Sequence, residues 1–237
     1  CVDSVSCNSY CEGRIEISVY PQSAIFYYNW DSVAVAGNNI IDSLCAGTPG
    51  VTITDINGQF IIHLDIPVYE PSPINNFSSI THPTCYNDTD GEIDITTNGG
   101  TSPFTYNWNT GLNAPDLLSI SGGIYELITT DNNNCKDTSS FILDNPNEVN
   151  SITITDTLSC IDMCDGDAIV IPNSGFTPYS FLWDDPLAPD SATATGLCYG
   201  LSTVYITDSM GCLDTNTVFI ENPERIFLRD FSDEDTG

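Results

Sequence analysis

Basic side chains are nearly missing from this chain of 237 residues, which has four lysines and arginines against 33 acidic residues. The resulting formal charge of -29 repels phosphate backbones, so we expect no nucleic-acid partner. Only two histidines occur, His63 and His82, and neither has a nucleophile motif nearby. A phosphate-binding glycine loop is also lacking. These absences argue against an enzyme, and we expect no catalytic residues.

Long apolar runs and amphipathic helix patterns are lacking as well. No apolar segment approaches the length of a membrane-spanning helix, and no signal peptide is visible, which fits a piece of a longer secreted chain. Hydrophobic residues instead alternate with polar ones in short segments such as GDAIVI, PYSFLW, TVYITD and TVFIEN. This period of two, with frequent Gly, Pro, Asn and Asp between segments, predicts β-strands. We therefore expect an all-β chain of immunoglobulin-like antiparallel β-sandwiches.

The chain repeats itself with a period of roughly 75 residues. A cysteine, a glycine and a tryptophan recur in register, as Cys7, Gly13 and Trp30 in copy one, Cys85, Gly91 and Trp108 in copy two, and Cys160, Gly166 and Trp183 in copy three. Prolines mark the ends of the copies. They predict repeat domains at 1–72 (divergent and incomplete at its start), 73–147 and 148–223, followed at 224–237 by the start of a fourth repeat or a disordered tail. Linkers this short predict an extended, semi-rigid rod.

Each tryptophan ends an alternating aromatic segment, FYYNW in copy one, FTYNW in copy two and YSFLW in copy three. Alternation places the aromatic rings on one face of a strand. Such a face suits stacking against sugar rings, but a tryptophan on a central strand is also a common core anchor of a β-sandwich. The core interpretation is the stronger one, because each copy offers only one tryptophan.

Ten cysteines, without the paired spacing of a zinc site, predict disulfides and an oxidising compartment. Copy two has only two cysteines, which we therefore expect to pair with each other, and copy three extends this pattern by alignment. Gln59 of copy one stands where the other copies have their last cysteine. The expected bridges are Cys85–Cys135, Cys160–Cys212, Cys164–Cys198, Cys11–Cys45 and, by elimination, Cys1–Cys7.

Acidic residues recur at the turns, at Asp55, Asp88, Asp90, Glu92, Asp131, Asp162, Asp165, Asp167 and Asp208. Calcium accepts such oxygen ligands, so a calcium site is one interpretation. Asp-Gly and Asn-Gly pairs are also ordinary turn chemistry, and no segment has the full spacing of a calcium loop. We assign no metal ligands and no cofactor, with calcium as the open alternative.

The tripeptide Asp-Ser/Thr-aliphatic recurs more often than composition suggests, although Asp-Ser is also a common way to start a turn. Its hydroxyl residues are Ser4, Ser32, Ser43, Thr157, Ser191 and Ser209.

The segments GGTSPFTYNW, TGLCYG, VYITDSMGC and FIENP resemble the SprB-type repeat of large surface adhesins in gliding Bacteroidota. Copies two and three carry most of this pattern, whereas copy one lacks the Gly-Gly-Thr run and the last cysteine. The resemblance implies export by the type IX secretion system, display on the outer cell surface, and a role in adhesion and gliding. It also makes the six hydroxyl residues candidate O-glycosylation sites, because the tripeptide resembles the acceptor motif of that phylum.

Two functions fit these observations. The first is a structural and adhesive segment of a secreted cell-surface filament, whose partners are extracellular surfaces or polysaccharides, neighbouring repeats and other filament chains. The second is an array of carbohydrate-binding modules attached to a secreted enzyme. A catalytic domain in the full-length gene would favour the second function, and many further copies would favour the first.

Overall fold

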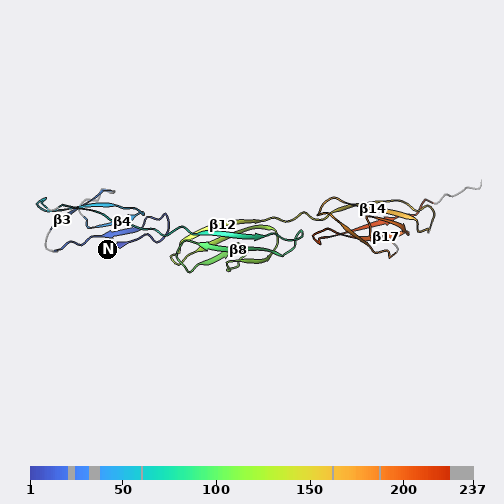
Figure 1. The fold of residues 1–237 in the computed structure, drawn as a ribbon, viewed down its shortest axis with the longest axis horizontal. Helices are drawn as coiled ribbons and strands as arrows, with labels where there is room; N and C mark the ends of the chain where they lie inside the picture. Colours follow the sequence, from blue (N-terminus) through green and yellow to red (C-terminus); the bar gives the residue numbers. More distant parts are fainter. Residues whose placement is uncertain (21–24, 32–37, 60, 162, 187, 225–237) are drawn as a thin grey trace, which may run out of the picture. The chain divides into compact units, whose positions relative to one another are not determined.

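The computed structural model describes residues 1–20, 25–31, 38–59, 61–161, 163–186 and 188–224. All regular structure within these ranges is β-strand, as Figure 1 shows, and each strand pair whose register is described is antiparallel. The all-β class predicted from the period-two pattern is therefore confirmed.

The chain divides into two compact units. The first comprises Cys1–Thr81, Glu92–Leu118 and Gly123–Leu143, and the second comprises His82–Gly91, Ser119–Gly122 and the chain from Asp144 onward. The division passes through copy two, so each unit contains parts of two copies. The domain boundaries expected from the repeats stay a prediction, and the tail beyond Glu224 lies outside the described residues.

Copy one lies in the first unit. Its strands are β1 (Val2–Asp3), β2 (Gly13–Glu16), β3 (Phe26–Trp30), β4 (Ile40–Leu44), β5 (Gly50–Asp55) and β6 (Ile61–Asp65). They form two three-stranded sheets, β1-β2-β4 and β3-β5-β6. Both sheets contribute to one core, which contains Val5, Ile15, Trp30, Ile41, Leu44, Val51, Ile53 and Val68. Copy one is therefore a β-sandwich.

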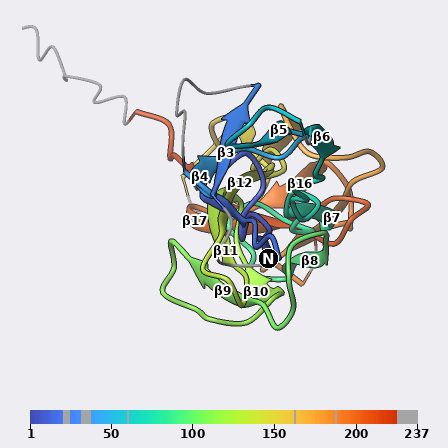
Figure 2. The same ribbon diagram turned by 90° about the vertical axis from the view of Figure 1, so that its left-hand side faces the viewer.

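Copy two supplies β7 (Asn75–Thr81), β8 (Gly91–Asn98), β9 (Thr105–Trp108), β10 (Leu117–Ile120), β11 (Gly123–Thr130) and β12 (Lys136–Leu143). The sheets are β7-β8-β10 and β9-β11-β12, and Figure 2 shows β9 beside its partner β11. The Trp108 ring packs against the Phe141 ring with centroids 5.7 Å apart. Alternating burial along β8 and β11 gives each strand one core face and one outer face.

Copy three lies in the second unit. Its strands are β13 (Ser151–Thr155), β14 (Gly166–Pro172), β15 (Ser180–Trp183), β16 (Thr193–Leu197), β17 (Gly200–Thr207) and β18 (Leu213–Ile220). They form the sheets β13-β14-β16 and β15-β17-β18 around a sandwich core of their own. That core includes Val149, Leu158, Ala168, Val170, Trp183, Ala194, Leu197, Val204, Ile206, Val218 and Ile220.

The three tryptophans share one environment, which matches the core interpretation of the aromatic segments. Trp30, Trp108 and Trp183 are 3%, 2% and 4% exposed. Each indole Nε1–H donates to a backbone carbonyl oxygen a few residues later, at 3.1, 2.9 and 3.0 Å respectively. The tryptophan thus fills the core and also satisfies its one polar group, as a buried indole requires.

The recurring acid–Gly pair is not a hairpin turn. Gly13, Gly91 and Gly166 are buried and begin β2, β8 and β14. A Cβ atom at Gly166 would lie 2.7 Å from Cγ2 of Ile220 and 3.2 Å from the carbonyl oxygen of Leu197. Glycine is therefore required by close packing of the strand against its neighbours.

Candidate functional site: the disulfide junctions

Four disulfides are present, and two of them lie inside a single copy. Cys11–Cys45 and Cys164–Cys198 occupy equivalent positions in copies one and three, and both span 34 residues. These are the two pairings that the alignment of the copies predicts for these cysteines.

The other two disulfides join neighbouring copies. Cys7 of copy one bonds to Cys135 of copy two, and Cys85 of copy two bonds to Cys212 of copy three. Cys1 and Cys160 are free and exposed. The expected bridges Cys85–Cys135, Cys160–Cys212 and Cys1–Cys7 are therefore wrong. Alignment identified the equivalent cysteines correctly but assigned their partners to the wrong copy.

Copy three shows the physical reason for this correction. Cys212 immediately precedes the eight-residue strand β18, whereas the N–H group of Leu158, two residues before Cys160, donates to Glu221 just after that strand. At about 3.3 Å per residue, β18 separates the two cysteines by roughly 25 Å. A disulfide requires Cα atoms about 5.5 Å apart, so the two ends of one copy cannot be bridged.

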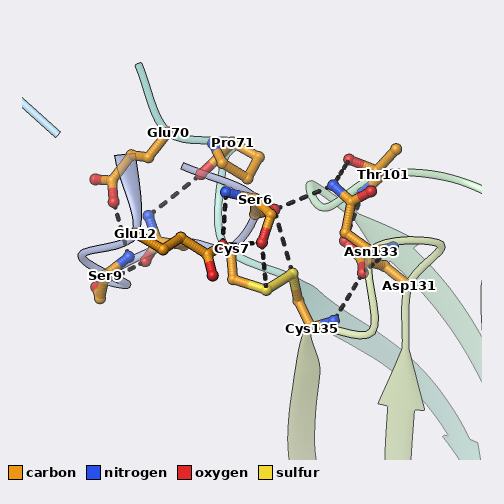
Figure 3. Close-up of a disulfide and its surroundings, with 11 residues drawn as sticks. Ser6, Cys7, Ser9, Glu12, Glu70, Pro71, Thr101, Asp131, Asn133 and Cys135 are labelled. Atoms are coloured by element: carbon orange, nitrogen blue, oxygen red, sulfur yellow. Dashed lines mark hydrogen bonds between the residues drawn. A yellow bond between two sulfur atoms is a disulfide. The ribbon is translucent and has the colours of Figure 1, made fainter. Parts of the chain in front are cut away.

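The last cysteine of copies two and three is carried by a turn built around a buried aspartate. Figure 3 shows this turn in the first unit, where the Asp131 carboxylate accepts the N–H groups of Thr101, Asn133 and Cys135 at 2.9, 2.8 and 2.9 Å. Asp131 is 5% exposed. The carboxylate therefore sets the backbone of the turn that presents Cys135.

Asp208 repeats this arrangement in the second unit. It accepts the N–H groups of Phe176, Met210 and Cys212 at 3.0, 2.9 and 2.9 Å. Burial acts to raise the pKa of Asp208, but these backbone donors and that of Gly211 outweigh it and leave the pKa below its ordinary value. Copy one has Asp55 at the equivalent position, accepting the N–H of Gln59 at 2.6 Å, so it retains the aspartate turn without the cysteine.

Cys7, Cys85 and Cys160, which are equivalent in the three copies, each lie in a loop closed by a second acidic residue. Glu12 accepts from the N–H and Oγ of Ser6 in copy one (Figure 3), Asp90 accepts from Thr84 in copy two, and Asp165 accepts from Ser159 in copy three. The side-chain hydroxyl, followed by the backbone N–H, lowers the pKa of Asp90 and of Asp165. These acidic residues are thus explained as loop-closing acceptors.

Further contacts surround the bridge in the first unit. The Asn133 side-chain amide donates to the Ser6 carbonyl oxygen at 3.1 Å (Figure 3). The Asn8 side-chain amide donates to the carbonyl oxygen of Pro71 at 3.3 Å. Cys7 and Cys135 are buried together with Ile74. In the second unit, Cys212 and Val149 belong to the buried core, and the partly buried Cys85 packs against it. Both junctions are therefore packed as well as covalently joined.

The structure gathers no metal-binding cluster among the residues it describes, where no group of three or more His, Cys, Asp or Glu side chains is arranged to hold an ion. Of the acidic turn residues, Asp162 lies outside the described residues, and five others serve as acceptors in turns and loops as described above.

The two histidines belong to different units, His63 to the first and His82 to the second. Nδ1 of His63 is 3.1 Å from Thr52 Oγ1 across the β5–β6 pair, and its Nε2 is 3.4 Å from Asp65 and 3.7 Å from Asp31. The His63 side chain is 48% exposed. Nδ1 of His82 accepts the N–H of Asp144 at 2.9 Å. Both histidines thus have structural partners.

The candidate glycan acceptors differ in accessibility. Ser4, Ser43, Thr157 and Ser209 are exposed. Ser191 is half-buried, and its Oγ donates to the Thr193 carbonyl oxygen at 2.6 Å. Ser32 lies outside the described residues. Exposure is thus compatible with modification at four of the six positions.

Taken with the fold, these junctions define a class of protein, in which tandem β-sandwich copies are tied to one another by disulfides. Residues 78–113 match the family model of the SprB repeat, and this segment contains Cys85, Gly91 and Trp108. The chain therefore carries an SprB repeat at copy two, as the resemblance predicted. No curated protein matches the chain.

Several solved structures are distantly similar. The N-terminal eight Ig domains of Down Syndrome Cell Adhesion Molecule share 9% identity at a TM-score of 0.37, with 93% of this chain and 34% of that chain covered. The Dpr2 Ig1-Ig2 complex with DIP-Theta Ig1-Ig3 shares 8% identity at a TM-score of 0.31, covering 94% and 97%. The Bacteroides ovatus mixed-linkage glucan protein SGBP-B, in complex with a heptasaccharide, shares 12% identity at a TM-score of 0.20, covering 92% and 65%. This chain thus spans about a third of the first structure, and likenesses at these TM-scores carry no functional argument.

Within the part of the chain that the structure describes, no helix is long and apolar enough to cross a membrane.

Proposed function

We propose that this chain is a segment of a large secreted cell-surface adhesin, with a structural and adhesive role and no catalytic activity of its own. The observation that carries the proposal is the SprB match at residues 78–113, in a chain whose neighbouring copies are joined by disulfides. Export by the type IX system and participation in gliding belong to the same proposal, because both are implied by the repeat.

The disulfides support an extracellular location. Such bonds persist in oxidising environments and are rare where cellular thiol buffers keep cysteines reduced. The formal charge of -29 supports a hydrated, soluble surface and repulsion between neighbouring chains, and this repulsion weakens as salt shortens the screening length.

The absence of catalysis is supported by the roles of the residues that would carry it. Asp131 and Asp208 are occupied by backbone N–H donors, and most cysteines are bonded to one another. His63 lies on the exposed strand β6, and its side chain is 48% exposed. General acid–base chemistry needs a positioned group in reach of a bound substrate, and these residues do not supply one.

O-linked glycans at Ser4, Ser43, Thr157 and Ser209 complete the proposal, because these hydroxyl groups are exposed within the recurring tripeptide. Ser191 and Ser32 remain candidates from the tripeptide alone. Intact-mass measurement of native material should exceed the polypeptide mass by whole sugar residues. A bare polypeptide mass would remove the glycan part of the proposal and leave the adhesive part standing.

The adhesive role is tested by deleting the parent gene in the source organism and measuring surface attachment and gliding speed. We expect reduced attachment, and complementation with the intact gene should restore it. As a control, complementation with a gene lacking the codons for residues 1–224 reports whether this segment itself is needed. Normal attachment and gliding after deletion, or a hydrolytic activity that maps to these residues, would contradict the proposal.

A further inference from the structure

Cys7, Cys85 and Cys160 occupy the same position in the three copies of the repeat, but only two of these three cysteines are bonded. Cys7 and Cys85 each bond to the last cysteine of the copy that follows. Cys160 is the equivalent residue of copy three, and it is free and exposed. The same position in two preceding copies therefore shows what kind of partner this thiol accepts.

The loop around Cys160 is built like the two loops whose cysteines are bonded. Ser159 donates its N–H and its Oγ to Asp165, as Thr84 does to Asp90. In both bonded junctions, the carbonyl oxygen of the residue before Cys7 or Cys85 lies close to the partner sulfur. The Ser6 oxygen is 3.3 Å from Cys135 Sγ, and the Thr84 oxygen is 3.5 Å from Cys212 Sγ. Copy three offers the corresponding thiol on the same loop.

We propose that Cys160 is a linking cysteine, which forms a disulfide with the last cysteine of a further copy of the repeat. Its partner is identified by chemistry, as a thiol on an aspartate-centred turn like the turns that carry Cys135 and Cys212. This inference goes beyond adhesion and does not depend on the surface that the protein binds. It extends the junction seen twice in the chain to a third position.

The bond forms by thiol–disulfide exchange with a disulfide-bonded oxidant of the thiol oxidoreductase class. The Cys160 thiolate attacks one sulfur of the oxidant, and the other sulfur leaves as a thiolate. The thiolate of the partner cysteine then attacks Sγ of Cys160 and releases the oxidant as a dithiol. Two protein thiols lose two protons and two electrons, and one disulfide of the oxidant is reduced.

Cys1 provides the internal comparison, because it is also free and exposed. It lies on the β1–β2 ladder, where its amino group and its carbonyl oxygen both bond to the backbone of Glu16. No bonded cysteine occupies an equivalent position in the other copies. Cys1 therefore serves as the reference for the reactivity of an exposed thiol that is not part of an inter-copy junction.

The test uses the 237-residue chain and an extended chain in which residues 147–223 follow Pro223 a second time, with Cys160→Ser in the added copy. Both are oxidised in a glutathione redox buffer, labelled with N-ethylmaleimide without reductant, and mapped by mass spectrometry. In the 237-residue chain, Cys1 and Cys160 should both be labelled. In the extended chain, Cys160 labelling should fall at least tenfold, Cys1 labelling should stay unchanged, and a peptide joining Cys160 to the added Cys212 should appear.

The matched control carries Cys212→Ser in the added copy only, and it should restore Cys160 labelling. Formation of the Cys164–Cys198 bridge in the added copy reports that this copy has folded. Cys160 that remains as reactive as Cys1 beside a folded added copy would overturn the proposal, as would a Cys160–Cys1 or Cys160–Cys85 bridge. In native material, Cys160 should form a disulfide with a cysteine that lies on an aspartate-centred turn of another copy. Non-reducing electrophoresis distinguishes a disulfide within one chain from a disulfide between chains. A free Cys160 thiol in native material would also overturn the proposal.

Discussion

Replacing Asp208 tests whether the buried aspartate holds the turn that presents Cys212. The carboxylate accepts three backbone N–H bonds, from Phe176, Met210 and Cys212. A hydrogen bond to a charged group contributes roughly 1.5–3 kcal/mol, but water reaches the exposed part of this turn and recovers some of the loss. We therefore expect Asp208→Ala to lower the free energy of unfolding of the second unit by about 3–5 kcal/mol. Asp208→Asn keeps one acceptor oxygen and should cost less, about 1–3 kcal/mol.

The measurement is urea unfolding of the intact chain, together with amide hydrogen exchange of Met210 and Cys212. Exchange at these amides should accelerate in Asp208→Ala even where the amides of β18 stay protected. Asp167→Asn is the matched control, because it removes an exposed carboxylate on β14 and changes the net charge equally. A loss below about 0.5 kcal/mol with unchanged exchange would refute the assignment of Asp208 as the centre of the turn.

The pH dependence of this effect has a definite sign. The folded-state pKa of Asp208 is lowered, so the ionised carboxylate stabilises the fold at pH values above the unfolded pKa, near 3.8. This contribution is lost as pH falls through the lower folded pKa. The unfolding difference between the native chain and Asp208→Asn should therefore be constant near neutral pH and shrink below about pH 4. Protonation of the other carboxylates at acid pH changes the stability of both chains, so comparing the two chains removes most of that effect. A difference in the free energy of unfolding that does not change with pH would contradict this account.

Three further predictions concern packing and loop closure. Gly166→Ala should lower the free energy of unfolding by about 1–3 kcal/mol, because the added Cβ meets packed atoms. Gly123→Ala is the control and should change the free energy of unfolding little, because its added Cβ has its nearest contact at 3.6 Å. Urea unfolding measures both variants, and equal stabilities of the two variants would contradict the prediction. Trp183→Phe removes an indole hydrogen bond and core volume and should cost about 2–4 kcal/mol, measured by thermal unfolding; an unchanged midpoint would argue against the core role. Thr84→Val removes a hydroxyl donor and should raise the pKa of Asp90 in an NMR titration of the carboxyl carbon, and an unchanged pKa would show that the hydroxyl does not close this loop.

The fold class and the core were predictable because each depends on local pattern. Alternation of apolar and polar residues determines which side chains share a face of a strand, and this alternation is visible in consecutive residues of the sequence. The segment ending in Trp108 therefore predicted both a strand and its buried side. The acid–Gly pairs were harder to interpret, because the packing of Gly166 against Ile220 depends on a strand that begins many residues later. A glycine in the sequence does not by itself distinguish a turn from a position where two strands pack closely.

The partners of the linking cysteines were not predictable from the alignment of the copies. Alignment shows that Cys7, Cys85 and Cys160 are equivalent, but it contains no information about which end of a sandwich each residue occupies. Strand direction and strand length provide that information, because Cys212 precedes β18 and Cys160 lies near its far end. An additional signal was present in the sequence: Gln59 left Cys7 without a partner in copy one, which would have favoured a partner in the next copy.

The overlap of the two inter-copy bridges shortens the covalent path through the molecule. Cys7 bonds to Cys135 and Cys85 bonds to Cys212, so the two loops, of 128 and 127 residues, interlock along the chain. A route that crosses both bonds connects Cys7 to Cys212 through only the residues between Cys85 and Cys135. At about 3.4 Å per extended residue, that route has a contour length of roughly 170 Å, against about 700 Å along the backbone. If all three sandwiches were pulled open under tension, the span from Cys7 to Cys212 would stop lengthening at about a quarter of its reach in the reduced chain.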